Sequence, residues 1–225
     1  MIQAHVDLFV KEVKECHFFS FDTESKGNLP RKDGLPDRLF CTMSGPKTGT
    51  ILMFHDCLDI PDDIIALFKD YAIAKIQSGI ANDVELFDNL GIDVYGLVDS
   101  GCLFLLIEPE SAAYGAGRQL EVLYPGRNSH VPYPVWQMPE DLEREHLRPK
   151  CRRHVIQDVL TPYATLYTAA IRRAARLRYR AQDDIMPLIQ EALEICYSRE
   201  PREAHAHTDK KKKSDLNEFD PPMNY

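Results

Sequence analysis

The sequence predicts an α/β domain built on a mixed β-sheet, and three observations support this fold class. Three apolar segments follow the first helix candidate with only short connections, which is typical of antiparallel strands. Strand and helix candidates then alternate from residue 62 to residue 101, which is typical of parallel strands. The chain has 225 residues, of which 44% are hydrophobic, so it can bury one sizeable core.

The N-terminal part predicts one helix and the three antiparallel strands. Residues 3–14 are amphipathic and charged, which indicates a helix. The next segment, CHFFSFDTES, is an aromatic, apolar run that ends on two acids, so we expect a buried strand with a polar end. RLFCTMSG and TILMFHD predict the other two strands, because a loop rich in glycine and proline and then a short turn precede them.

The following part predicts the parallel strands and the helices that flank the sheet. Residues 62–71 have acids in the first turn and apolar residues at helical spacing, so they predict a helix. AKIQSGI predicts a short strand, residues 82–90 a helix, and GIDVYGLVDSG a loop with another strand. Residues 108–149 are rich in proline and glycine and are expected to be mostly irregular. Two helices are expected over 153–179 and 183–197.

The chain divides into one domain, residues 1–197, and a charged tail, residues 198–225. The tail has few apolar residues and contains four successive lysines at 210–213. This composition favours disorder of the tail in isolation. A partner-binding or nuclear-import segment is the alternative interpretation.

The charge of the chain limits the classes of function. A formal net charge of −8 argues against a protein that coats nucleic acid non-specifically, because phosphate binding needs local positive potential. Basic residues predominate between 144 and 180 and acidic residues between 56 and 99, which predicts a basic half and an acidic half. No apolar stretch is long enough to span a membrane. We expect a cytoplasmic or nuclear protein without a membrane partner.

Five residues are candidates for metal binding or catalysis. Asp22 and Glu24 end the first strand candidate, and alternation puts both side chains on one face, close enough to share a cation. Solvated loop residues are the alternative for this pair. Asp83 lies near the start of a helix candidate, where an aspartate is usually a cap. His154 and Asp158 are four apart on a predicted helix, the geometry for a water-orienting group beside a metal ligand.

Together these motifs resemble those of the DEDD-type 3′-5′ exonucleases, in the branch of ribonuclease D, the Werner-type exonuclease and the Mut-7 and Egalitarian-like domains. FDTES is similar to the first family motif, KIQSGIANDVELFDNLGI to the second and RPKCRRHVIQDVL to the third. The family's third motif has a tyrosine, three residues and an aspartate, and His154 takes the tyrosine's place. A competing register puts Tyr163 and Tyr167 over this motif and lacks the final aspartate. Asp99 resembles a further family aspartate, which we expect to be structural.

This resemblance covers about residues 16–175 and implies a ribonuclease-H-like mixed sheet and a metal-dependent 3′-5′ exonuclease. In the family, two divalent cations, Mg²⁺ or Mn²⁺, support phosphodiester hydrolysis. It implies that the cations are bound by four carboxylates and that His154 orients or deprotonates the attacking water. The implied metal ligands are Asp22, Glu24, Asp83 and Asp158. The implied partner is a nucleic acid, with a single-stranded RNA 3′ end favoured over DNA.

Four arginines on the long C-terminal helix candidate are candidate phosphate contacts. The helical period puts Arg172, Arg176 and Arg180 along one stripe, with Arg173 beside it. A solvated helix face is the alternative for this stripe.

A catalytically inactive exonuclease-like domain is the second hypothesis for the function. The altered third motif and the net acidity favour it. Such a domain would serve as an RNA-binding or scaffold module in an RNA-processing or small-RNA pathway, with a protein partner on the tail or the acidic face.

Overall fold

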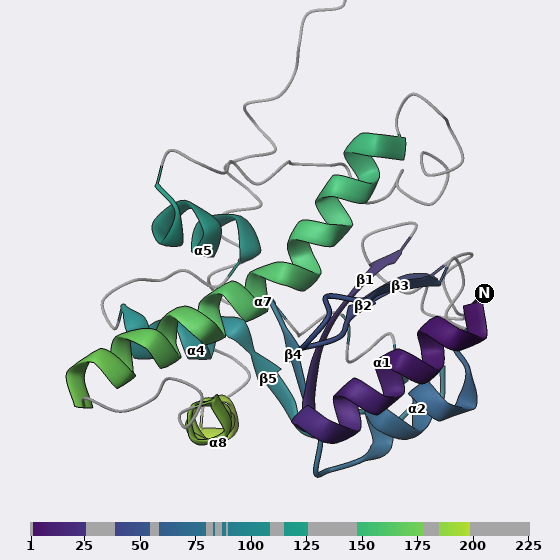
Figure 1. Ribbon diagram of the computed structural model, residues 1–225, viewed down its shortest axis with the longest axis horizontal. Helices are drawn as coiled ribbons and strands as arrows, with labels where there is room; N and C mark the ends of the chain where they lie inside the picture. Colours follow the sequence, from purple (N-terminus) through teal and green to yellow (C-terminus); the bar gives the residue numbers. More distant parts are fainter. Residues whose placement is uncertain are drawn as a thin grey trace, which may run out of the picture.

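A mixed five-stranded sheet forms the centre of the computed structural model, with strands in the order β3-β2-β1-β4-β5 (Figure 1). The structure describes residues 2–25, 39–54, 59–79, 83, 87–88, 90–108, 115–125, 148–177 and 185–198. The strands are β1 (Phe18–Ser25), β2 (Leu39–Ser44), β3 (Ile51–Phe54), β4 (Ala74–Gln77) and β5 (Leu97–Asp99). The predicted α/β class and its three antiparallel strands followed by parallel strands are confirmed.

The central strand β1 explains why the first strand candidate is so apolar. It pairs antiparallel with β2, from Ser20 opposite Ser44 to Ser25 opposite Leu39. On its other side it pairs parallel with β4, which in turn pairs parallel with β5. A central strand is covered on both faces of the sheet, so its residues must be buried on both sides until the strand reaches its polar end.

Two helices, α1 (Ile2–Cys16) and α2 (Asp62–Lys69), cover one face of the sheet. Phe19 and Phe21 of β1 pack edge-to-face on Phe68 of α2, with ring centroids 5.2 and 5.1 Å apart. Phe87 joins the same cluster and lies 5.6 Å from Phe21. Edge-to-face aromatic pairs stabilise a core beyond the area that they bury, so this cluster fixes β1 against α2.

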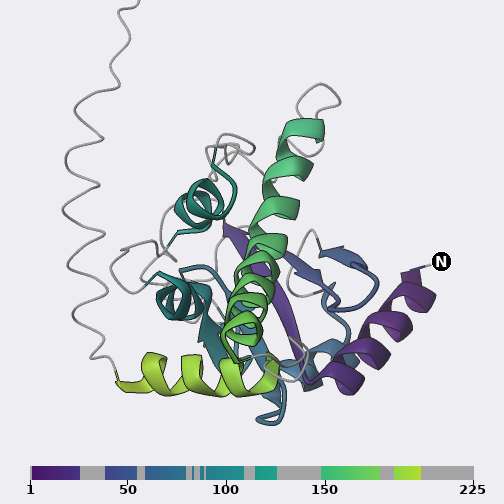
Figure 2. The same ribbon diagram turned by 60° about the vertical axis from the view of Figure 1, so that its left-hand side comes forward.

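Four helices cover the opposite face, α4 (Ser100–Ile107), α5 (Ala116–Leu123), α7 (Arg148–Leu177) and α8 (Ile185–Ser198). Figure 2 shows α7 crossing in front of the sheet, with α8 below it. The core on this side joins buried apolar residues of β1, β4, β5, α4, α7 and α8, among them Phe18, Ile76, Leu103, Leu166 and Ile189, and Leu123 of α5 packs against it. None of the described helices combines the length and the apolar character that crossing a bilayer would need.

The structure contains two helices that the sequence analysis does not predict. α4 is buried almost all round, so its sequence lacks the polar face that would mark a helical period. Asp99 is its N-cap and accepts a hydrogen bond from the Gly101 amide at 2.7 Å, a structural role. α5 lies within the segment 108–149, whose expected irregularity is therefore wrong at residues 116–123.

Two predicted elements fall partly or wholly outside the described residues. Within the expected helix 82–90, the described residues Asp83, Phe87 and Asp88 are helical, whereas Leu90 lies in a turn. The tail beyond residue 198 is not described.

The long helix α7 begins at Arg148 rather than at residue 153 and contains 30 residues. Pro149 fits its first turn, because the backbone N–H that proline lacks would have no helical partner there. Pro162 lies inside the helix and cannot donate a hydrogen bond to the carbonyl of Asp158. Figure 1 shows that α7 changes direction near its middle, the usual effect of an internal proline.

Tyr163 attaches α7 to the sheet. Its buried hydroxyl accepts a hydrogen bond from the Ser20 amide at 2.9 Å and donates one to the Ser44 carbonyl. Ser20 and Ser44 face each other across β1 and β2. One hydroxyl therefore links α7 to both strands.

Replacing this hydroxyl should destabilise the fold. Tyr163→Phe leaves a buried amide and a buried carbonyl without this partner, so we expect a loss of about 1–3 kcal/mol in the free energy of unfolding. Urea denaturation followed by circular dichroism measures this loss. Tyr167→Phe is the matched control, because Tyr167 is 38% exposed and its hydroxyl lies 3.3 Å from the Pro46 carbonyl. An equal effect of both substitutions would contradict the special role of Tyr163.

Candidate active site

The five residues singled out in the sequence meet near the carboxyl-terminal end of β1. Asp22 and Glu24 come from β1, and Asp83 from the helical residues that follow β4. His154 and Asp158 come from the N-terminal half of α7, which lies over the same end of the strand (Figure 1). Strand alternation turns Asp22 and Glu24 toward the α7 side, the side of Ser20 and Tyr163.

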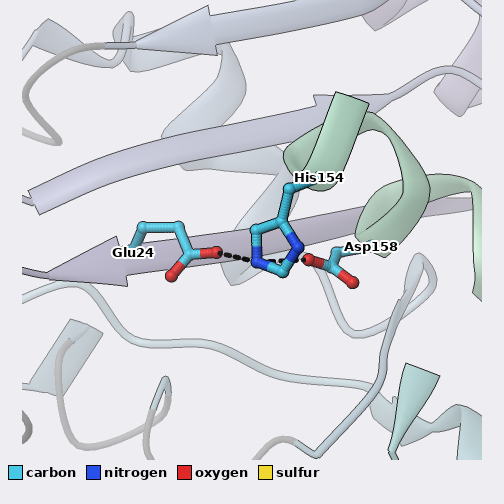
Figure 3. A group of neighbouring side chains, drawn as sticks. All are labelled: Glu24, His154 and Asp158. Carbon is cyan, nitrogen blue, oxygen red and sulfur yellow. Dashed lines mark ion pairs between the residues drawn. The ribbon is translucent and has the colours of Figure 1, made fainter. Parts of the chain in front are cut away.

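His154 lies between two carboxylates. Its Nε2 atom is 3.5 Å from Glu24 Oε1 and 3.2 Å from Asp158 Oδ2. Figure 3 shows the imidazole ring between the two acids, with both contacts made by the same nitrogen. The side chains of His154 and Glu24 are only 6% and 8% exposed, and that of Asp158 is 13% exposed. One potential metal-ligand atom of each residue lies within 4.8 Å of the other two.

Gln77, at the end of β4, is a site residue that the sequence analysis does not identify. Its Nε2 atom donates a hydrogen bond to Asp22 Oδ1 at 3.5 Å. The residue is 1% exposed, and its Oε1 atom has no hydrogen-bond partner among the described residues. The signal in the sequence is a polar residue that ends a strand next to β1, since the carboxyl ends of parallel strands meet at one edge of a sheet.

Asp83 approaches the site from the other face of the sheet. Its Oδ1 atom accepts a hydrogen bond from the Thr23 hydroxyl. Thr23 lies between Asp22 and Glu24, so alternation turns its side chain toward α1 and α2. Phe87, one turn after Asp83, is anchored in the aromatic core on that face. The four carboxylates therefore reach the end of β1 from both of its sides.

Burial and mutual repulsion raise the pKa values of these acids. Burial raises the pKa of Asp22 well above its ordinary value, and the negative charges of Glu24, Asp158 and Asp83 raise it further. The pKa of Asp83 rises to about 7, mainly because of burial and against the hydrogen bond from Thr23. Burial also raises the pKa of Glu24, although the contact with His154 opposes this. The site therefore favours a bound positive charge.

The candidate phosphate-binding arginines lie at the other end of α7. Arg172 Nη1 is 2.6 Å from Glu108 Oε1, and Arg173 Nη1 is 2.6 Å from Glu191 Oε2. At 1.5 Å rise per residue, Arg172 is roughly 20 Å along the helix from Asp158. These pairs tie α7 to the end of α4 and to α8. The side chain of Arg176 and the whole of Arg180 lie outside the described residues, and phosphate contact stays a prediction for all four.

The tyrosines of the competing third-motif register have other partners. The Tyr163 hydroxyl bonds to the backbone of β1 and β2, and the Tyr167 hydroxyl lies 3.3 Å from the Pro46 carbonyl. His154 and Asp158, in contrast, lie against Glu24.

Comparison with known proteins identifies the fold. No family model and no curated protein matches the chain. Among solved structures, Brucella melitensis NrnC is 17% identical and has a TM-score of 0.53, over 81% of this chain and 86% of that one. Trypanosoma brucei RNase D with GMP is 16% identical, with a TM-score of 0.54 over 82% of this chain and 62% of that one. Escherichia coli RNase D is 18% identical, with a TM-score of 0.54 over 84% of this chain and 48% of that one.

These similarities show that the chain has the ribonuclease-H-like fold of RNase D and NrnC, the fold that its motifs imply. The chain spans about half of the Escherichia coli protein and most of NrnC.

The raised pKa values predict how stability depends on pH without a divalent cation. Between pH 4 and the folded pKa of about 7 for Asp83, the folded state binds more protons than the unfolded state. The stabilising contribution of this group is complete below about pH 4 and is lost as pH rises through the folded pKa. Asp22 and Glu24 shift in the same direction. Urea denaturation in EDTA at pH 5.5 and 8.5 should show the lower unfolding free energy at pH 8.5.

Asp22→Asn isolates the contribution of the site to this pH dependence. It removes one of the repelling charges, so we expect a gain on the order of 1–3 kcal/mol in the free energy of unfolding at pH 8.5. Asp93→Asn, which changes an exposed aspartate in the loop before β5, should keep the wild-type profile. A loss of stability at pH 8.5 in Asp22→Asn would contradict the repulsion.

Proposed function

We propose that this protein is a metal-dependent 3′-5′ exonuclease that acts on nucleic acid, with RNA favoured over DNA. The observation that carries the proposal is the convergence of four carboxylates from β1, α7 and the segment after β4 at one end of the central strand. The charges of Glu24, Asp158 and Asp83 all act on Asp22. A fold builds such repulsion into its interior at a cost in stability, which a bound cation offsets.

The residues present fit divalent cations. Carboxylate oxygens are the ligands that Mg²⁺ and Mn²⁺ prefer, and Asp22, Glu24, Asp83 and Asp158 would hold two such ions. The buried amide oxygen of Gln77, which has no partner among the described residues, is a further acceptor beside them. Bound there, the ions would supply Lewis-acid activation of water and stabilise the negative charge that develops on the phosphate. A structure of Brucella melitensis NrnC with bound Mg²⁺ supports this proposal.

Neutral side chains of this chain orient the candidate ligands. The Thr23 hydroxyl holds the Asp83 carboxylate, and the Gln77 amide holds that of Asp22. Hydrogen bonds of this kind fix the direction of a ligand oxygen before it binds and keep it near its working geometry. Thr23 and Gln77 are therefore proposed as positioning residues.

The similar structures support a substrate class for the proposed nuclease. NrnC is known with pGG and Trypanosoma brucei RNase D with RNA U12, and Escherichia coli RNase D is described as an exoribonuclease of structured RNA processing. These ligands support a nucleic acid substrate with a free 3′ end and favour single-stranded RNA for this chain. The protein would act in the cytoplasm or the nucleus.

One observation favours a second function, an inactive exonuclease-like domain that binds RNA or a protein partner. His154 replaces the tyrosine of the resembled motif, and its Nε2 atom contacts two of the four candidate ligands. If this imidazole acted as a permanent counter-charge, it would take the place of a cation. The domain would then serve as a scaffold in an RNA-processing or small-RNA pathway, with its partner on the tail or the acidic face.

Trimming of labelled substrates tests the proposal. With Mn²⁺, a 5′-labelled single-stranded RNA should give a ladder of products shortened from the 3′ end, a DNA of the same sequence should be trimmed more slowly, and a circular RNA should remain intact. Asp22→Asn and Asp158→Asn should each lower the RNA trimming rate at least about 100-fold, the scale on which active sites lose rate with an electrostatic group. Asp93→Asn should trim at the wild-type rate.

The outcomes separate the two functions. Loss of the ladder in both site variants supports the nuclease. A ladder that persists in Asp22→Asn contradicts the proposed ligands. Absence of trimming, with RNA still bound in a filter-binding assay, favours the inactive domain.

A further inference from the structure

We propose that His154 is itself a metal ligand, and that the site therefore prefers a transition-metal ion such as Mn²⁺ over Mg²⁺. The inference rests on the proposed function and specifies which cation the nuclease uses. It departs from the water-orienting role that the resemblance implies for this residue.

The spacing around His154 fits a shared ion. Neighbouring ligands at about 2.1 Å from a cation lie roughly 3.0 to 3.4 Å from each other for angles between 90° and 109°. The Nε2 atom is 3.2 Å from Asp158 Oδ2 and 3.5 Å from Glu24 Oε1. The three potential ligand atoms also lie within 4.8 Å of one another.

The direction of the imidazole also fits a metal ligand. The Nε2 atom of His154 points between Glu24 and Asp158, where a shared ion would lie (Figure 3). The fold holds it there, because Val155 and Val159 are fully buried on the same helix and Glu24 is paired with Phe40 in the sheet.

Imidazole changes which ion the site selects. Mg²⁺ prefers oxygen ligands and keeps much of its water, whereas the affinity of a site with a nitrogen ligand rises along the transition-metal series that begins with Mn²⁺. An imidazole beside carboxylates therefore favours Mn²⁺ relative to Mg²⁺. An ion between Glu24, Asp158 and His154 has one nitrogen and two carboxylate ligands. A phenol in the same position supplies no nitrogen, so His154→Tyr should restore a preference for Mg²⁺ relative to the wild type.

Pulsed electron paramagnetic resonance of Mn²⁺ bound to the full chain tests the ligand directly. We expect ¹⁴N modulation from a coordinated imidazole in the wild type. It should disappear in His154→Gln while Mn²⁺ is still bound by the carboxylates. His5→Gln, which changes an exposed histidine on α1, should keep the modulation.

Calorimetric titration tests the selectivity. The ratio of the Mg²⁺ to the Mn²⁺ dissociation constant should fall at least about tenfold in His154→Gln and in His154→Tyr, which corresponds to about 1.4 kcal/mol. An unchanged ratio in both variants would overturn the inference. Two variants of different size guard against a folding defect in one of them.

The outcomes distinguish this inference from the proposed function. Mn²⁺ binding and RNA trimming without ¹⁴N modulation would overturn the role of His154 and leave the nuclease standing. Absence of binding by either ion would overturn both, because the imidazole would then hold the carboxylates as their counter-charge.

Discussion

The structure depends on one electrostatic constraint, the confinement of acidic groups at the end of a buried central strand. β1 is covered by α1 and α2 on one face and by α7 on the other, so Glu24 is buried and Asp22 is only partly exposed, unlike acids on an edge strand. Burial and the charges of neighbouring acids raise the pKa of Asp22. Such an arrangement lowers stability at neutral pH. Its retention in the fold is understandable if a cation neutralises it, which is why the repulsion supports the proposed chemistry.

Different parts of the long helix α7 have different roles. One part carries candidate site residues, and the others attach the helix to the rest of the fold. Its N-terminal half carries His154 and Asp158, while Tyr163 bonds to β1 and β2 near its middle. Its C-terminal half forms ion pairs with Glu108 and Glu191. Exposed ion pairs of this kind contribute little energy individually. The apolar residues Leu166, Ala169 and Ala170, which are buried in the core shared with α4 and α8, hold this half of the helix on the sheet.

The candidate site is supported from both faces of the sheet. Thr23 and Gln77 hold acidic side chains by neutral hydrogen bonds, so they orient the oxygens without neutralising their charge. His154 differs because it contacts two acids at once. In the group Glu24, His154 and Asp158, whose ligand atoms are close enough to share an ion, it supplies the only nitrogen. The same imidazole is compatible with a metal ligand in an active nuclease and with a counter-charge in an inactive domain. Metal binding separates these roles because a ligand and a counter-charge have opposite effects on affinity for the ion.

The sequence by itself determined the elements whose residues repeat with a local period. Period two placed Asp22 and Glu24 on one face of β1, and period 3.6 placed His154 and Asp158 on one face of α7. The sequence did not reveal α4, because a helix that is buried almost all round has no polar face to mark its period. It also did not reveal the roles of Thr23 and Gln77. Thr23 meets Asp83 across 60 positions and Gln77 meets Asp22 across 55. Only the tertiary structure decides such contacts, because a local period fixes where a side chain points but not which distant element packs against it.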